Sequence, residues 1–291
     1  MLASFSVKEG SRVNSGPRSG VRSASARTAA VVLVLALAVM AAAARDDSDD
    51  QPLPVRYPEG MLHGFLVLKN QSGTIIARGD QLQTPRRDGR IASRMTFRFT
   101  DGSLLDERVV FSQEDVFIVY EYHLSQRGPA FAQNAEAFFE RPSRKYRVRT
   151  VDSDDGKVDI TEGDLDQLPA STYNGMVITL LKNLAPDRSA TVRMVAFTPT
   201  PRFIGLELTP VGKTRASFGN ESKTAVQYAI KPRLGFFLKI GAKLTGKDPP
   251  DSHAWIISED VPAFAKFVGP LSMSGTGAPW TIELTSPTWT Q

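Results

Sequence analysis

The chain has 291 residues, no cysteine and a formal net charge of +4 at pH 7. Residues 1–44 hold five basic side chains and one acidic one, so the whole positive excess lies there and the rest is neutral. Without cysteine there are no disulfides, thiol catalysis or thiolate metal sites, and the neutral remainder argues against nucleic-acid binding.

Residues 1–44 have the three parts of a secretory signal peptide. Basic residues precede an uncharged, apolar run from Thr28 to Ala44, which ends in four alanines. A basic start, an apolar centre and small residues at the end are typical of a cleaved signal. We therefore predict cleavage near Ala44 and a periplasmic or secreted protein. Retention of the apolar run as a membrane anchor is the alternative.

The next segment, 45–58, is acidic, contains prolines and shows no apolar periodicity. Such a segment buries little apolar surface. We predict that residues 45–58 form a flexible leader and that residues 59–291 form a single antiparallel β domain.

From Met61 onward, apolar residues alternate with polar ones at period two, which indicates half-buried β-strands. Turns rich in Gly, Asp and Asn separate these strands at hairpin spacing. The sequence therefore predicts a mostly β fold, a large antiparallel meander curved into an open half-barrel or barrel. Alternating sets include Ile91, Met95, Phe97 and Phe99; Val116, Ile118, Tyr120, Tyr122 and Leu124; Ile204, Leu206 and Leu208; and Trp280, Ile282 and Leu284.

The hairpin around Asp101-Gly102 can be registered from its pattern. A two-residue loop would place charges on the apolar face, whereas a three-residue loop with a left-handed Gly102 pairs Phe97 with Leu105 and separates the two faces. The preferred register leaves Glu107 on the apolar face, opposite Met95. A lone carboxylate there is unfavourable unless it is paired or has a raised pKa. Either an arginine pairs with it, or it anchors the polar group of a ligand.

One segment, near 170–184, has helical character. Ser171 or Thr172 can cap its start, and Pro186 ends it. A helix that is apolar nearly all round is buried, so we predict one buried helix in the concavity of the sheet or at the mouth of a barrel. Its apolar residues are Met176, Ile178, Leu180, Leu181 and Leu184.

The segment from Leu234 to Leu244 alternates at period two, with two lysines opposite its apolar face. We predict a core strand. Contact with a membrane surface through Leu234, Phe236 and Leu238 is the alternative.

The sequence contains no catalytic motif, and we predict no metal or cofactor. The histidines His63, His123 and His253 lie far apart in the chain. The acidic stretch 152–156 has its glycine at the fifth position rather than the sixth that a calcium loop requires. Glu107, Glu121 and His123 are the acid–base candidates if the protein is a hydrolase-like enzyme.

The later part of the chain carries a resemblance to a known family. An apolar helical segment follows Pro169 within the meander, and tryptophan-bearing strands with a proline-aromatic turn follow, in residues 254–267 and 279–284. This order resembles the open β half-barrel of secreted bacterial proteins, of which the outer-membrane lipoprotein carriers of the LolA/LolB type are the known representatives. The resemblance covers about residues 60–287 and is topological, so no binding residue carries over. It implies that acyl chains or lipoproteins bind in the concavity.

We therefore expect an exported cell-envelope protein that binds or carries an apolar ligand, such as a lipid, in the concavity of its sheet. An interaction module in envelope assembly and a hydrolase-like enzyme are the alternatives. The predicted ligand-binding residues are Glu107, Met95, Phe97, Tyr120, Tyr122, Met176 and Leu180.

Overall fold

The computed structural model describes residues 51–152, 155–197, 201–218, 221–233, 251–259, 261–271 and 279–285, although the side chains of 216–218 and 221 are not described. The predicted signal peptide at 1–44 and the predicted core strand from Leu234 to Leu244 lie outside the described residues. So does the alternative for that strand, a membrane contact through Leu234, Phe236 and Leu238. All described residues belong to one unit, Asp49–Gln291.

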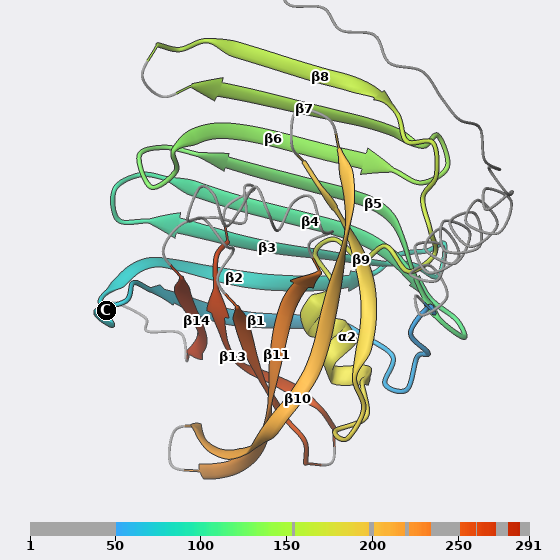
Figure 1. Cartoon of the computed structure of the whole chain (residues 1–291). Coiled ribbons are helices and arrows are strands. Elements are labelled where there is room, and N and C mark those ends of the chain that lie inside the picture. The colour runs from blue at the N-terminus through green and yellow to red at the C-terminus, as the bar shows by residue number, and fades with distance from the viewer. Residues whose placement is uncertain are drawn as a thin grey trace, which may run out of the picture. The chain divides into compact units, whose positions relative to one another are not determined.

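Fourteen strands form one antiparallel sheet, in the order β8-β7-β6-β5-β4-β3-β2-β1-β14-β13-β12-β11-β10-β9 (Figure 1). Neighbouring strands are consecutive in the chain, except that β1 pairs with β14. The predicted mostly β antiparallel meander is therefore confirmed. The strands are β1 (Leu62–Lys69), β2 (Ile75–Pro85), β3 (Ile91–Phe99), β4 (Leu104–Gln113), β5 (Phe117–Arg127), β6 (Gln133–Glu140), β7 (Lys145–Asp152), β8 (Val158–Asp164), β9 (Ala190–Ala196), β10 (Arg202–Phe218), β11 (Glu221–Arg233), β12 (Ser252–Ile257), β13 (Ala263–Gly269) and β14 (Trp280–Thr285).

The sheet is neither closed nor strongly curled, so the predicted barrel or half-barrel is wrong. Closure would require β8 to pair with β9, but these consecutive strands stand at opposite ends of the sheet. The connector between them occupies part of the β9 edge instead. The Tyr173 amide donates to the Arg193 carbonyl at 2.8 Å, and the Arg193 amide donates to the Ser171 carbonyl at 2.9 Å.

The predicted helix is present and buried but shorter than expected. Helix α2 spans Val177–Asn183, and Met176 precedes it without a side-chain cap. Ser171 and Thr172 do not cap it, because they lie in a turn before the helix, where their backbone bridges to Arg193 of β9. Leu180 and Leu181 of the helix lie in the core.

The predicted register of the β3–β4 hairpin is confirmed. Phe97 pairs with Leu105 and Met95 with Glu107, and Gly102 has the left-handed φ of 85° that a three-residue loop requires.

The predicted alternation of β5 holds for Tyr122 and Leu124 but is wrong before them, where Phe117 and Val119 are buried rather than Ile118 and Tyr120. Val110 pairs with Glu121 and Phe111 with Val119, which leaves Tyr120 as an extra residue in a β-bulge. The buried positions therefore change from odd to even numbers along the strand, with Val119 buried before the bulge and Tyr122 buried after it.

Residues 51–58 of the predicted flexible leader instead lie against the domain. Leu53 is buried. The amides of Arg56 and Tyr57 donate to Oδ1 of Asn183 in α2, at 2.8 and 2.7 Å. These bonds fix the chain before it enters β1.

One core joins the two parts of the sheet, β1 to β8 and β9 to β14. We call the face that packs against α2 the inner face and the opposite face the outer face. On the inner face, the ring of Tyr122 in β5 stacks on Phe197, just after β9, at 6.0 Å, and Phe99 of β3 contacts Trp280 of β14 at 5.4 Å. Strands far apart in the sheet order thus share one hydrophobic cluster.

Candidate functional site

The apolar residues predicted to bind a ligand are largely used for packing. Phe97, Met176 and Leu180 are almost fully buried, with exposed fractions of 0, 1 and 0%. All three belong to the core cluster, and Met95 packs against it. The structure thus brings them together in one core cluster, as the interior of the protein itself.

Glu107 and Tyr122 form a polar pair on the inner face. The Tyr122 hydroxyl donates to Oε1 of Glu107 at 2.8 Å. Burial raises the pKa of Glu107, and the bond from Tyr122 offsets only part of that effect. Among the described residues Glu107 has no ion pair, so the arginine partner considered from the sequence is not found.

The connector after β8 covers this pair. Asn174 is buried and holds both backbone groups of Val195 in β9, accepting from its amide at 2.8 Å and donating to its carbonyl at 2.9 Å. Gly175 follows with a left-handed φ of 72°, and a Cβ there would lie 3.2 Å from the Tyr122 ring and 3.5 Å from the Glu107 carboxyl carbon. The pair therefore lies between strand and connector.

Tyr120 does not join this group, because the β-bulge removes it from the regular alternation. Its ring instead receives the guanidinium of Arg90, 3.7 Å from the ring centroid. It thus lies in a cation–π contact with the β2–β3 turn.

The three acid–base candidates do not come together at one place. His123 lies on the outer face, 3.0 Å from Glu136, and Glu121 is an exposed residue of the same face. Glu107 faces the connector on the inner face. In the part of the chain that the structure describes, no three metal-ligating side chains come together either.

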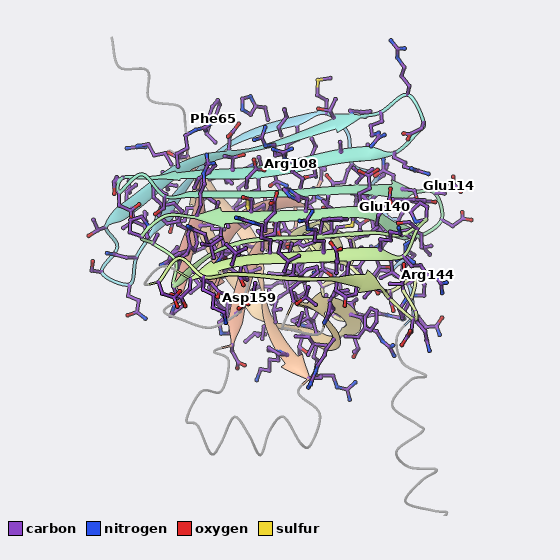
Figure 2. All side chains as sticks on the ribbon, turned by 90° about the horizontal axis from the view of Figure 1, so that it is seen from above. Phe65, Arg108, Glu114, Glu140, Arg144 and Asp159 are labelled. Atoms are coloured by element: carbon purple, nitrogen blue, oxygen red, sulfur yellow. The ribbon has the colours of Figure 1, made fainter. Side chains whose placement is uncertain are left out.

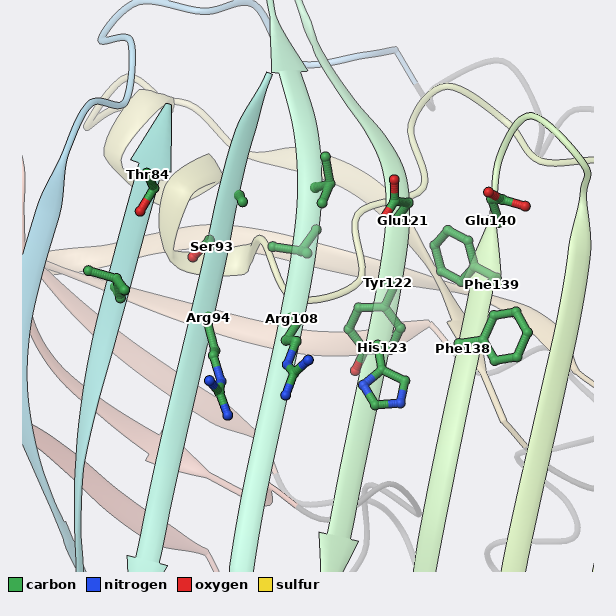
Figure 3. A pocket seen from close by; sticks show the side chains of 14 residues that line it. Thr84, Ser93, Arg94, Arg108, Glu121, Tyr122, His123, Phe138, Phe139 and Glu140 are labelled. Atoms are coloured by element: carbon green, nitrogen blue, oxygen red, sulfur yellow. The ribbon is translucent and has the colours of Figure 1, made fainter. Parts of the chain in front are cut away.

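A groove of about 670 Å³ crosses the outer face of five consecutive strands, β2 to β6 (Figure 3). Helix α2 lies behind these strands in Figure 3, on the other face. Each strand contributes two alternate side chains to the groove, and Figure 2 shows Arg108 and Glu140 on these strands from another direction. The outer-face lining is Leu82, Thr84, Ala92, Arg94, Arg108, Val110, Glu121, His123, Phe138 and Glu140.

Two arginines form a basic row in the groove. Arg94 and Arg108 are directly opposite each other on β3 and β4. Both donate through Nε and Nη2 to Asp106, whose side chain is only 6% exposed. Burial alone would raise the pKa of Asp106, but the hydrogen bonds and charges of Arg108 and Arg94 outweigh it and lower that pKa. One carboxylate therefore serves two guanidinium groups, which leaves a positive charge.

Two glutamates form an acidic row on the next two strands, β5 and β6, displaced along the strand direction from the basic row on β3 and β4 (Figure 3). Glu121 of β5 pairs directly with Glu140 of β6. Like charges directly opposite each other destabilise a sheet. Arg86 lies 3.7 Å from Glu121, and Ser143 donates to Glu140 at 2.6 Å. The acidic row is thus only partly compensated.

An apolar floor accompanies these rows. Ala92 leaves room because its side chain is small, and Val110 beside it is 9% exposed. Phe138 and Leu82 stand at the two flanking strands of the groove. The Val110–Glu121 pair borders the β-bulge, where the twist of the sheet increases.

The sequence pattern did not identify this groove. The pairing of Arg94 with Arg108 follows from the predicted β3–β4 register, but charges on an outward face are usually only solvated. The acidic row depends on the pairing of β5 with β6 and on the bulge at Tyr120, which the alternation does not show.

Comparisons with protein-family models, with curated proteins and with solved structures gave no match. Within the described ranges, no helix has the length and hydropathy to cross a membrane.

Proposed function

We propose that the protein binds a phospholipid with a zwitterionic head group in the outer-face groove. The phosphate contacts the basic row, the ammonium group contacts the acidic row, and the acyl chains lie on the apolar floor. The observation that carries this proposal is the presence of two rows of opposite charge, Arg94 with Arg108 and Glu121 with Glu140, in one groove with an apolar floor.

Donors for the phosphate are available on both arginines. A guanidinium group carries five N–H donors in a planar fork that suits phosphate oxygens. Arg94 and Arg108 use Nε and Nη2 for Asp106, and the contacts found among the described residues leave Nη1 of both without an acceptor. Their side chains are 49 and 53% exposed, so a ligand can reach them.

The separation of the rows fits a head group that carries both charges. Arg108 and Glu121, the nearest members of the two rows, are two residues apart along neighbouring strands, which corresponds to about 7 Å along the strands and about 5 Å across them. An ammonium group between Glu121 and Glu140 would also relieve the repulsion of that pair. A ligand with an anionic group alone would leave this repulsion in place.

The dimensions suit an acyl chain. Five strands extend about 19 Å across the groove, and a volume of about 670 Å³ falls within the range of small-molecule sites, roughly 300–1,000 Å³. Phe138 and the exposed Leu82 supply apolar contacts at the flanking strands.

This proposal keeps the predicted class of ligand and moves its site. The inner face, where the sequence predicts binding, is occupied by α2 and the connector, whereas the outer face has the groove. Export and a place in the cell envelope stay predictions from residues 1–44, and the likeness to lipoprotein carriers stays a prediction from topology. Together they suggest that the groove holds or carries lipid in the envelope.

Titration with short-chain, water-soluble phospholipids tests the proposal. We expect tighter binding of phosphatidylethanolamine than of phosphatidylglycerol with the same acyl chains, because only the former has an ammonium group. Arg108→Gln should weaken the binding of both lipids by about tenfold, which corresponds to the loss of one charge-assisted hydrogen bond. Glu140→Gln should weaken the binding of phosphatidylethanolamine alone.

Two variants serve as controls for these measurements. Arg98→Gln removes an exposed charge from the outer face of β3 outside the groove lining, and Glu114→Gln does so in the β4–β5 turn. Both should bind like the unaltered protein. Equal loss of affinity in Arg98→Gln and Arg108→Gln would contradict the proposal, as would equal affinity for the two lipids.

A further inference from the structure

Two stretches of sheet edge have no neighbouring strand among the described residues and carry opposite charge, and neither belongs to the groove. The first is on β10, which continues past the end of β9 (Figure 1). β9 pairs with β10 only as far as Leu208, so residues 209–218 have no neighbour on that side among the described strands. We call this stretch the β10 edge.

The β10 edge is exposed and basic. Residues 211–215 are all exposed, and the large apolar side chain of Val211 is 58% exposed. Lys213 and Arg215 are alternate residues and therefore point to the same face. In the described part of the chain neither makes an ion pair.

The second stretch is β8, the terminal strand at the other end of the sheet. It pairs with β7 alone among the described strands. Ile160 is 49% exposed, although large apolar residues are unusual on an unprotected edge. Glu162 and Asp164 are alternate residues of one face, like the two basic residues on β10.

From these features we propose that β8 of one copy of the protein pairs with the β10 edge of a second copy. The pairing is antiparallel, and it places Lys213 opposite Asp164 and Arg215 opposite Glu162. Each basic residue then meets an acidic one directly across the strands, where opposite charges stabilise pairing. The strand hydrogen bonds continue from one sheet into the next.

Charge favours this pairing over pairing of identical edges. Two β8 strands would bring Glu162 and Asp164 against acidic residues, and two β10 edges would bring Lys213 and Arg215 against basic ones. Glu162 already lies 3.6 Å from Arg147, but its side chain remains 67% exposed and can take a second cation. The contact is head-to-tail, because each copy offers a different edge.

Sedimentation equilibrium of the full chain with two charge-reversed variants tests this proposal. The β10 variant carries Lys213→Glu and Arg215→Glu, and the β8 variant carries Glu162→Lys and Asp164→Lys. We expect the unaltered chain to self-associate, and each variant alone to do so at least about tenfold more weakly, because attraction becomes repulsion at two cross-strand positions.

Mixing the variants gives the decisive result. An acidic β10 edge then meets a basic β8, so a mixture should recover the association that each variant has lost. Circular dichroism of each variant shows whether the sheet is retained. A monomeric unaltered chain, undiminished association of the variants, or a mixture that stays dissociated would overturn the proposal. Binding of the monomeric chain to anionic vesicles through Lys213 and Arg215 would overturn it as well.

Discussion

At the scale of single residues, the pKa values of two neighbouring carboxyl groups on β4 shift in opposite directions, because one lies on the outer face and the other on the inner face. Asp106 points outward to two arginines, which lower its pKa. Glu107 points inward to a tyrosine hydroxyl, and burial raises its pKa. The two groups therefore make stability depend on pH with opposite signs.

Replacing Glu107 separates these contributions. Because the folded protein holds the Glu107 proton more tightly than the unfolded chain does, the free energy of unfolding falls as the pH rises above the usual glutamate value of about 4.3. We expect Glu107→Gln to remove this decline and to be more stable than the unaltered protein at neutral pH. Urea unfolding across acidic to neutral pH measures the effect.

Asp106 supplies an internal reference for that measurement. Because its pKa is lowered in the folded protein, Asp106 stabilises the fold at pH values above the usual aspartate pKa. This stabilisation is lost as the pH falls through the pKa of the folded state. Glu107→Gln should still lose stability at low pH, because Asp106 is unchanged in this variant. If the free energy of unfolding of Glu107→Gln still declined towards neutral pH as in the unaltered protein, the Glu107 carboxyl would not titrate as described.

At the scale of elements, the connector between β8 and β9 does more than join two strands. Its first part occupies the β9 edge, Asn174 bonds the β9 backbone, and α2 fills the inner face. A Cβ at Gly175 would lie against the Glu107–Tyr122 pair.

A pair of glycine substitutions measures that approach. Gly175→Ala introduces a Cβ at a positive φ and against Tyr122, and it should destabilise the protein by about 2–3 kcal/mol. Gly102→Ala shares the positive φ, 85° against 72°, but nothing lies within 4 Å of its Cβ. It should cost only about 1 kcal/mol. Equal losses in thermal unfolding would mean that backbone strain alone accounts for both.

The elements also show what the sequence could and could not predict. The register around Gly102 was predictable because only one loop length separates apolar from charged residues. The extra residue Tyr120 was not, since a bulge changes no side-chain type. The start of α2 was misplaced because backbone pairing of Ser171 and Thr172 with a distant strand overrode their local preference for capping.

At the scale of the whole molecule, the core predicts how the domain unfolds. Inner-face side chains of β3 to β5 contact residues near β9 and in β14 within one cluster. We expect tryptophan fluorescence and far-ultraviolet circular dichroism to report the same denaturant midpoint. A Trp289→Phe background confines the fluorescence to Trp255 and Trp280, which lie in β12 and β14. Two separate midpoints would contradict a shared core.

The pairing of β1 with β14 also sets the order in which the sheet can assemble. Every other pairing joins consecutive strands, so each hairpin can form soon after its second strand is synthesised. The contact of Leu68 with Ile282 instead closes a loop that contains almost the entire domain, and closing a long loop has a high entropic cost before any contact forms. During synthesis, two partial meanders must therefore wait, with inner faces uncovered, until β14 emerges and joins them. That interval is when the chain is most vulnerable to aggregation.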